Sequence, residues 1–206
     1  MTPEALRLRI ARRLPVRWTE APLPLAYHAA GPKSGLSRLA AGQAPYWAYL
    51  WPGGAALIAH LAAQPGLVRG KRVLDLGAGS GLVGIAAVRC GARKVVASEI
   101  DPLARIALEL NAALNFVTLD AVGDVLSGPP PRVDLILVGD LFYDPDLARR
   151  VTAFLARSGV PALVGDIGRE SLPRERLERV ADYPVREVGE PATAPAHAGS
   201  VWRFRR

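Results

Sequence analysis

The sequence predicts an α/β fold: a seven-strand, mostly parallel sheet that helices cover on both faces, with the last strand antiparallel. Short apolar runs alternate with helix-length segments from residue 52 onward, which is the pattern of parallel strands joined by helical crossovers. A glycine-rich turn follows the first of these runs, as it does where a strand leads into a ligand-binding helix. The 206 residues, 50% hydrophobic and 22% charged, favour one domain and exclude wholesale disorder.

Residues 1–45 have the pattern of an arm rather than of a second domain. A basic, partly apolar segment at 4–13 predicts a short amphipathic helix. Residues 14–45 are interrupted by five prolines and three glycines, so we expect them to be irregular. We expect this arm to pack on a core domain that spans residues 46–206.

The first half of the core domain predicts two strand–helix units behind an opening helix. The expected elements are a helix at 52–63, a strand at 72–76, a helix at 82–90, a strand at 95–99 and a helix at 102–114. Pro52 can begin the first of these helices because its missing N–H costs nothing there. Gly91 occupies the usual stop position of the second.

The second half continues the alternation and then changes direction. We expect a weakly marked strand at 116–119, a buried strand at 134–139, a helix capped by Asp144-Pro145 that runs to 157, a strand at 161–165, a helix at 172–181, and an antiparallel pair at 185–188 and 201–204. Residues 189–199, rich in Pro, Ala and Gly, would connect that pair. This succession of elements makes the predicted sheet Rossmann-like.

The glycine-rich turn is the most informative stretch, because it carries acids at positions that select a ligand. It reads Val73-Leu-Asp-Leu-Gly77-Ala-Gly79-Ser-Gly81, and glycines there let a ligand approach the backbone. Asp75 would repel a pyrophosphate and attract an amino group, while Glu99, at the end of the next strand, can accept both hydroxyls of a ribose. A nucleoside with an amino-acid tail, S-adenosylmethionine, fits both acids. A dinucleotide fits Glu99 but not Asp75, and a plain tight turn explains neither.

Asp124 follows the third predicted strand. At that end of a parallel sheet its carboxylate can receive the amino group of an adenine. The alternative interpretation is a solvated loop acid, and position alone does not separate the two.

Four of the 13 aromatic residues fall within six positions: Tyr46, Trp47, Tyr49 and Trp51. One interpretation is a hydrophobic anchor that holds the arm on the sheet. The other is an aromatic wall beside a cation such as a sulfonium or an ammonium, which gains about 0.5–2 kcal/mol over a ring face. Both can hold for different rings, and we assign Trp51 to the cofactor pocket.

The fourth predicted strand ends in Gly139-Asp140-Leu141-Phe142-Tyr143-Asp144. Ligands of parallel sheets bind outside the carboxyl ends of the strands, so Asp140 and Tyr143 are expected at the same rim as Gly77 and Glu99. Asp140 could instead cap the next helix, but Asp144-Pro145 already marks that start. We therefore expect Asp140 and Tyr143 to be catalytic residues.

At this point the sequence resembles the seven-strand, class I methyltransferases that use S-adenosylmethionine. Asp140-Leu-Phe-Tyr143 matches the Asp/Glu-x-x-Tyr/Phe motif of the lysine methyltransferases called methyltransferase family 16. More narrowly, the chain resembles the methyltransferases that act on the electron transfer flavoprotein beta subunit. The segments that carry this likeness are 45–54, 99–102, 139–144, 165–169 and 200–204. The sequence departs from the family at Glu99, where aspartate is common, and at Ile167, where proline is expected.

The resemblance implies methyl transfer to lysine ε-amines, with the electron transfer flavoprotein beta subunit as the expected substrate and a ribosomal protein as a further one. It also adds Ile100, beside Glu99, to the cofactor-binding residues. Asp140 is expected to orient the lysine and attract its charge rather than to act as a strong base. RNA methylation stays an alternative, although RNA-directed relatives commonly carry two prolines where this chain has Leu141 and Phe142. A nucleotide-binding module without catalysis is the other alternative.

Composition narrows the partners and the location. The single cysteine, Cys90, and three widely separated histidines predict no disulfide scaffold and no metal site. The net charge of +7 suits a polyanion, but the basic residues, all but three of them arginines, are spread along the chain. We therefore expect no nucleic-acid partner, and a monomer.

We also expect a cytoplasmic protein. No apolar run reaches the ~18 residues of a membrane-spanning helix. The basic N-terminus imitates a mitochondrial presequence, but Glu4 and Glu20 are acidic and serine is absent before residue 34.

Overall fold

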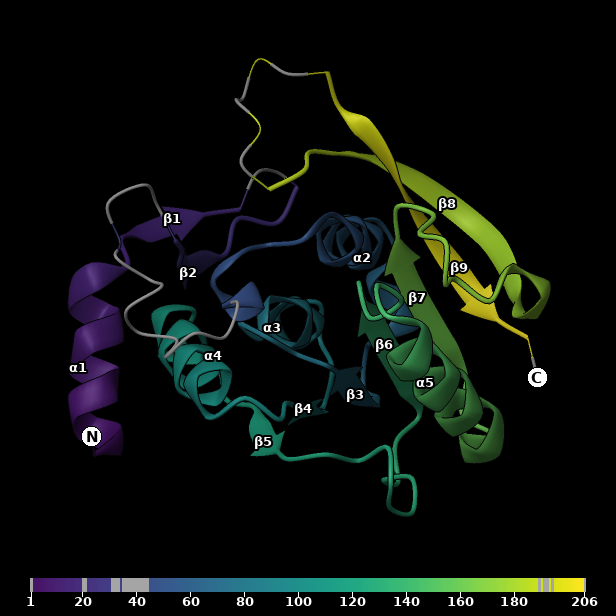
Figure 1. Ribbon diagram of the computed structural model, residues 1–206, viewed down its shortest axis with the longest axis horizontal. Coiled ribbons are helices and arrows are strands. Elements are labelled where there is room, and N and C mark those ends of the chain that lie inside the picture. The colour runs from purple at the N-terminus through teal and green to yellow at the C-terminus, as the bar shows by residue number, and fades with distance from the viewer. Residues whose placement is uncertain are drawn as a thin grey trace.

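The computed structural model describes residues 2–19, 22–30, 34, 45–188, 190, 193 and 195–205. Its main sheet has seven strands in the order β5-β4-β3-β6-β7-β9-β8 (Figure 1). The strands are β3 (Arg72–Leu76), β4 (Lys94–Ser98), β5 (Asp120–Val122), β6 (Leu135–Gly139), β7 (Ala162–Asp166), β8 (Leu177–Val185) and β9 (His197–Phe204). Strands β3 to β7 pair in parallel, whereas β9 is antiparallel to both of its neighbours. The predicted fold class is confirmed, including the antiparallel last strand.

Helices lie on both faces of this sheet. They are α1 (Pro3–Arg13), α2 (Pro52–Ala63), α3 (Leu82–Arg89), α4 (Pro102–Leu114) and α5 (Pro145–Ser158). Residues of α2 and α3 share one apolar cluster with one face of the strands, and residues of α5 share another with the opposite face (Figure 1). Along β6 the side chains alternate between the two clusters, with Leu135 and Leu137 in the first and Ile136 and Val138 in the second. That alternation is what a strand buried on both faces requires.

The N-terminal segment packs against α4. Helix α1 and a short 3-10 helix, η2 (Tyr46–Ala48), bury Ile10, Leu14 and Trp47 together with Ala104 and Ala107 of α4. A small hairpin of β1 (Val16–Trp18) and β2 (Ala26–His28) forms where we expected irregular chain. The helix predicted at 4–13 is confirmed; the boundary predicted at residue 45 stays a prediction.

Two buried asparagines of α4 hold that hairpin. Asn115 accepts a hydrogen bond from the N–H of Ala26 and donates one to its carbonyl, and Asn111 accepts one from the N–H of His28. Asn111 also donates to the carbonyl oxygen of Ser80 in the glycine loop. These bonds link the N-terminal segment to the loop at the head of the sheet.

The clearest error of the sequence prediction lies at 172–181. We expected a helix, but a 3-10 turn, η4 (Arg174–Arg176), is followed directly by the long strand β8. Strand β8 pairs with β9 from Leu177↔Phe204 to Val185↔His197, with a bulge between Arg179 and Ala181. This long-range pairing outweighs the local helix propensity of the segment.

Smaller differences concern strand limits. The third strand is at 120–122 rather than 116–119, because α4 extends to Leu114 and Phe116 then turns the chain with a φ of 56°. The last pair was predicted too short: β8 replaces the strand expected at 185–188, and β9 begins inside the predicted loop. None of the described helices has the length and apolar character needed to cross a bilayer.

Candidate active site

The carboxyl ends of four neighbouring strands bring together the acids that the sequence singled out. Strands β4, β3, β6 and β7 lie side by side, with Leu76 in register with Ser98 and Val138, and Gly139 with Gly165. The residues that end or follow these strands, Gly77, Glu99, Asp140 and Asp166, therefore share one rim. This is the edge where ligands of parallel sheets bind.

The glycine loop has the backbone conformation that its sequence predicts. Gly77, Gly79 and Gly81 have φ values of 68°, 53° and 80°, a region that favours glycine. Glu99 fixes the loop from the next strand: one carboxylate oxygen accepts from the N–H of Gly79 and the other from the N–H of Asp101, each at 2.8 Å. Among the described residues, a Cβ on Gly79 would have Trp47 alone within 4 Å, so they leave this part of the loop open.

Asp75 lies behind the loop. It is 2% exposed, and its Oδ2 accepts a hydrogen bond from the N–H of Gly84, in the first turn of α3, at 2.8 Å. Burial raises the pKa of this carboxyl from 3.8 to about 7; the charge of Glu99 adds to the rise and the Gly84 N–H opposes it. In this structure Asp75 supports the start of α3 from within the core.

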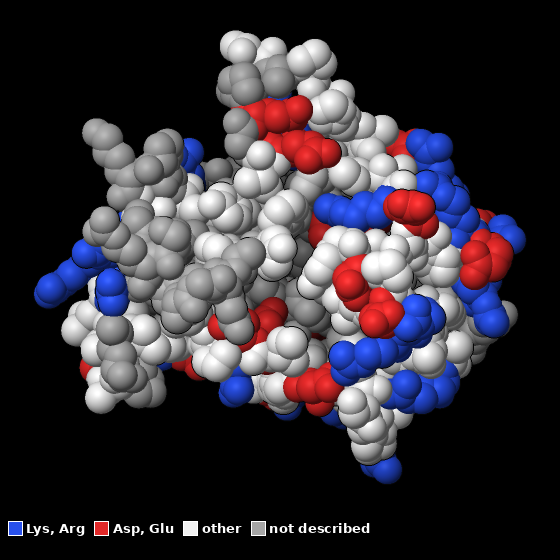
Figure 2. Space-filling view, in the orientation of Figure 1, with Lys and Arg blue, Asp and Glu red and all other residues white. Residues whose placement is uncertain are grey.

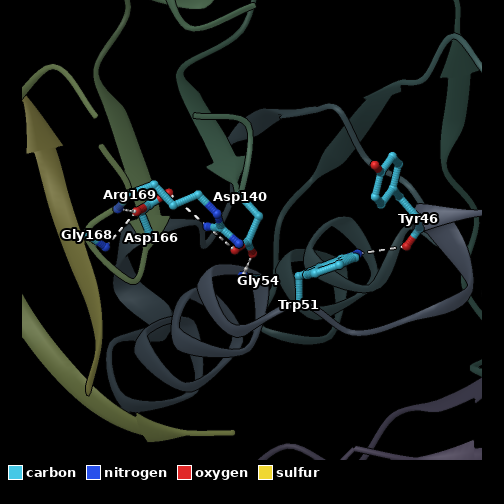
Figure 3. A network of polar contacts seen from close by, with 7 residues as sticks. All are labelled: Tyr46, Trp51, Gly54, Asp140, Asp166, Gly168 and Arg169. Atoms are coloured by element: carbon cyan, nitrogen blue, oxygen red, sulfur yellow. Dashed lines mark hydrogen bonds and ion pairs between the residues drawn. The ribbon is translucent and has the colours of Figure 1, made fainter. Parts of the chain in front are cut away.

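Asp140 is a buried carboxylate in a left-handed backbone conformation, with a φ of 55° and 8% exposure. Its Oδ2 accepts from the N–H of Gly54, at the start of α2, at 2.7 Å, and its Oδ1 accepts from Nη1 of Arg169, also at 2.7 Å (Figure 3). Burial raises the pKa of Asp140, while Arg169 and the helix N–H groups oppose that rise. The role of capping α5 belongs to Asp144, whose carboxylate accepts from the N–H of Leu147.

Helix α2 reaches Asp140 because glycines allow a backbone crossing. A Cβ on Gly53 would overlap the carbonyl oxygen of Gly165, and a Cβ on Gly165 would overlap that of Gly53. Only glycine at both positions lets α2 lie directly on the end of β7. The positive end of the helix dipole then points at the Asp140 carboxylate.

Two residues of this site were missed as functional residues, Asp166 and Arg169. Asp166 is fully buried at the end of β7, and its carboxylate accepts from the N–H groups of Gly168 and Arg169 (Figure 3). Arg169 links it to Asp140. The sequence did contain a signal for Asp166, because this acid directly follows a predicted strand. The spacing of residues gave no signal that Arg169 reaches the end of the neighbouring strand.

The aromatic segment divides into an anchor and a wall. Trp47 is buried against α1 and α4. Tyr46, in contrast, is 56% exposed and lies with its ring centroid 5.8 Å from those of both Trp51 and Tyr143. The indole N–H of Trp51 donates to the carbonyl oxygen of Tyr46 at 2.8 Å (Figure 3). The anchor interpretation therefore holds for Trp47, whereas the wall beside a cation stays a prediction for the other rings.

The remaining predicted residues lie farther along the rim. Ile100, next to Glu99, is 75% exposed, which is unusual for a large aliphatic side chain. Asp124 lies two residues beyond β5, where its carboxylate accepts from the N–H of Leu126, the hydroxyl of Ser127 and the guanidinium of Arg150. Asp124 is thus engaged by its own loop and by α5.

Comparison with known proteins agrees with the chemistry of this rim. The family description of the ribosomal protein L11 methyltransferases (PrmA) matches residues 60–156. The electron transfer flavoprotein beta subunit lysine methyltransferases of Mus musculus and Homo sapiens are 39% and 37% identical to this chain, over 78% of it in both cases. The matched regions make up 67% and 65% of those two proteins. The ribosomal protein L11 methyltransferase of Geobacter sulfurreducens is 45% identical over 60% of this chain and 45% of its own.

Solved structures agree on the fold. A Pyrococcus horikoshii protein provisionally assigned as an RNA methyltransferase has a TM-score of 0.60 at 16% identity, over 99% of this chain and 98% of its own. Magnesium protoporphyrin IX methyltransferase from Synechocystis, with bound S-adenosylmethionine, has a TM-score of 0.54 at 14% identity, over 73% of this chain and 76% of its own. The rim, the fold and the similarity to the mouse enzyme lead to one conclusion: the chain belongs to the family of electron transfer flavoprotein beta subunit lysine methyltransferases.

Proposed function

We propose that this protein transfers methyl groups from S-adenosylmethionine to lysine ε-amines of a protein, with the electron transfer flavoprotein beta subunit as the first candidate substrate. The observation that carries the proposal is the buried Asp140 carboxylate at the rim that also holds Glu99 and the glycine loop, three residues before Tyr143, whose ring meets that of the exposed Tyr46. The names of the mouse and human relatives supply the substrate.

The residues at the rim fit this cofactor. Glu99 has spare acceptor positions for ribose hydroxyls, because each carboxylate oxygen accepts only one hydrogen bond from the described residues and can accept two. Gly79 leaves room for a close approach, whereas Gly77 packs against the side chain of Leu141, and Ile100 offers an apolar face to a base. We assign Trp51 to the wall of the pocket and Asp124 to the adenine side. When bound, the cofactor supplies an electrophilic methyl group on a sulfonium.

The assignment of Asp75 changes in the light of its surroundings. Its carboxylate accepts a hydrogen bond from the N–H of Gly84, and its raised pKa of about 7 means that it gives up its proton only near neutral pH. A role in shaping the loop and the start of α3 fits these facts better than direct binding of a free amino group.

Asp140 and the rings suit a lysine acceptor. A lysine is a cation until it loses a proton, and a buried carboxylate attracts and orients that cation. The rings of Tyr143 and Tyr46 can flank its alkyl chain and favour positive charge at its head. Positioning supplies much of the acceleration in a displacement of this kind, so Asp140 need not act as a strong base.

A ribosomal protein is the second candidate substrate. The Geobacter sulfurreducens relative and the matched family description both concern ribosomal protein L11. RNA is disfavoured, because Leu141 and Phe142 stand where RNA-directed relatives commonly carry prolines.

The two protein substrates can be compared directly. Purified electron transfer flavoprotein beta subunit and ribosomal protein L11, both from the source organism, would be incubated with enzyme and labelled S-adenosylmethionine, and modified peptides would be located by mass spectrometry. We expect methylated lysines on the flavoprotein subunit and an initial rate at least about tenfold above that on L11, a difference of about 1.4 kcal/mol in transition-state stabilisation. A faster reaction on L11 would reverse the order of the candidates.

A further inference from the structure

The guanidinium of Arg169 bridges two carboxylates that end neighbouring strands. Its Nη1 lies 2.7 Å from Oδ1 of Asp140 and 3.1 Å from Oδ2 of Asp166 (Figure 3). The side chains are largely withdrawn from solvent, at 19% exposure for Arg169, 8% for Asp140 and 0% for Asp166. At such burial an ion pair is weakly screened, so the loss of one partner leaves a charge without compensation.

The two carboxylates are held differently. Asp166 is fixed within its own turn, since its Oδ1 accepts from the N–H groups of Gly168 and Arg169 at 2.6 and 2.7 Å. For Asp140, α2 satisfies Oδ2, and Oδ1 accepts one hydrogen bond from the described residues, donated by Arg169. A carboxylate oxygen can accept two hydrogen bonds, so Oδ1 keeps one position for an incoming donor.

The charges of Asp140, Arg169 and Asp166 suit the binding of a cationic substrate. One guanidinium and two carboxylates carry a net charge of −1, which attracts a lysine ammonium and is neutralised when it arrives. Without the guanidinium, two buried carboxylates would be neighbours, and Asp140, the less firmly held, would tend to take up a proton. A protonated Asp140 neither attracts nor orients a cation.

On the basis of the proposed function, we propose that Arg169 is a positioning residue for methyl transfer, which acts through Asp140 by keeping its carboxylate charged and its Oδ1 turned toward the substrate. We regard Arg169 as a positioning residue rather than a catalytic one, because its guanidinium donates to the two carboxylates.

A purely structural role in the 166–169 turn is the competing explanation, and Arg174 provides a control for it. The guanidinium of Arg174 donates to the carbonyl oxygen of Gly168 at 2.7 Å, so it holds the same turn. That hydrogen bond does not involve Asp140. The substitution Arg174→Met therefore loosens the turn and leaves the Asp140 carboxylate with its partner.

The kinetic experiment compares Arg169→Met, Arg169→Lys and Arg174→Met with the wild type, on the best protein acceptor. For Arg169→Met we expect kcat to fall about 100-fold with the affinity for S-adenosylhomocysteine unchanged. Lysine keeps the positive charge but not the planar guanidinium, so the kcat of Arg169→Lys should be about tenfold higher than that of Arg169→Met. Arg174→Met should stay within about twofold of wild-type kcat. Equal losses in Arg174→Met and Arg169→Met, or wild-type kcat in Arg169→Met, would overturn the proposal.

A second readout needs no acceptor and separates this proposal from the proposed function. Carbon-13 labelling of aspartate lets the Asp140 carboxyl be titrated by NMR, with Asp140→Asn to assign its signal. Burial raises the pKa of Asp140, and among the described residues the charge of Arg169 opposes this rise, together with the N–H groups of Gly53 and Gly54 from α2. The pKa of Asp140 should rise by about one unit or more in Arg169→Met and stay unchanged in Arg174→Met.

The outcomes are distinct. An enzyme that transfers no methyl group to protein, but whose Asp140 titrates as expected, contradicts the proposed function and leaves the electrostatic role of Arg169 intact. An unchanged Asp140 titration in Arg169→Met contradicts the role of Arg169, whatever the acceptor. If Arg169→Met does not fold, Arg169→Lys decides: a kcat within about twofold of the wild type rejects the proposal, and a loss of about tenfold at unchanged cofactor affinity supports it.

Discussion

Asp140 combines three properties that rarely occur together: burial, a positive φ and an ion pair. A carboxylate fixed in this way can bind a second cation besides Arg169, such as a substrate lysine, in a defined position. We expect Asp140→Asn to lower kcat/KM by about 10²-fold or more, which corresponds to roughly 2.7 kcal/mol of transition-state stabilisation. Asparagine keeps the shape and an acceptor for the Gly54 N–H, so the melting temperature and cofactor affinity should change little.

The matched control for Asp140→Asn is Asp144→Asn, four residues away at the exposed N-cap of α5. Its rate per folded molecule should equal that of the wild type. Thermal melting, calorimetry with S-adenosylhomocysteine and initial rates on one preparation of each variant make the comparison. A stable Asp140→Asn variant with a near wild-type rate would remove Asp140 from the mechanism.

Glu99 is expected to control cofactor affinity. It can bind the ribose, and it already fixes the loop through the N–H of Gly79. Each charge-assisted hydrogen bond lost in Glu99→Ala is worth about 1.5–3 kcal/mol, so S-adenosylhomocysteine should bind at least about tenfold more weakly. Calorimetry measures this, and an unchanged affinity would contradict the assignment. A nicotinamide dinucleotide should leave the wild-type melting temperature unchanged.

Asp75 makes stability depend on pH. Burial raises its pKa in the folded protein to about 7, above the value of 3.8 expected when unfolded, so the folded state binds the proton more tightly. Its contribution to the free energy of unfolding is therefore largest at low pH and is lost as the pH rises through about 7. Between pH 5 and pH 8 the free energy of unfolding of the wild type should fall by about 2 kcal/mol more than that of Asp75→Asn. Urea unfolding of both proteins at the two pH values tests this; parallel pH dependence would contradict it.

Helix α2 delivers its N–H groups to Asp140 only because two glycines meet. We expect Gly53→Ala to lower the free energy of unfolding by about 1–3 kcal/mol, since a Cβ there overlaps the backbone of β7. It should also reduce the rate, because the N-terminus of α2 must move away from Asp140. Gly66→Ala is the control, as a Cβ at that position meets none of the described residues within 4 Å. If urea unfolding gave the two variants the same stability, the claim that the crossing of α2 and β7 requires glycine at residue 53 would be contradicted.

Elements whose signals are local could be predicted from the sequence. Helix α5 carries its cap at Asp144, and β6 is an uninterrupted apolar run. Strand β8 could not be predicted, because its helix-compatible sequence becomes a strand only by pairing with β9. The β1–β2 hairpin likewise depends on Asn111 and Asn115 of α4, which are more than 80 positions away in the chain.

The candidate site was predictable to the extent that it follows from sheet geometry. Asp140, Glu99 and the glycine loop could be placed at one rim because parallel strands end at the same edge. The direction of a side chain could not be predicted in this way. Asp75 turns into the core toward Gly84, and Arg169, in the turn after β7, reaches across to Asp140 at the end of β6. Such contacts depend on the packed backbone rather than on spacing.

At the scale of the whole molecule, the charge of +7 does not by itself indicate a nucleic-acid surface. On the face shown in Figure 2, Lys and Arg side chains alternate with Asp and Glu where β8, β9 and α5 lie. Ion pairs such as Arg179–Asp182 and Arg203–Glu178 contribute to this mixture. On this face the mixture of charges differs from the basic stripe that is typical of a polyanion site. A single species of monomer mass in sedimentation would agree with the expected oligomeric state.

The central claim is that the methyl group reaches a lysine of a protein. The most direct test incubates the enzyme with labelled S-adenosylmethionine and an extract of the source organism, then hydrolyses the labelled material and identifies the modified residue. We expect the label in methyl-lysine, released by protease, resistant to ribonuclease and absent with the Asp140→Asn variant. Label that resists protease and is released by ribonuclease would contradict the claim and identify the protein as an RNA methyltransferase.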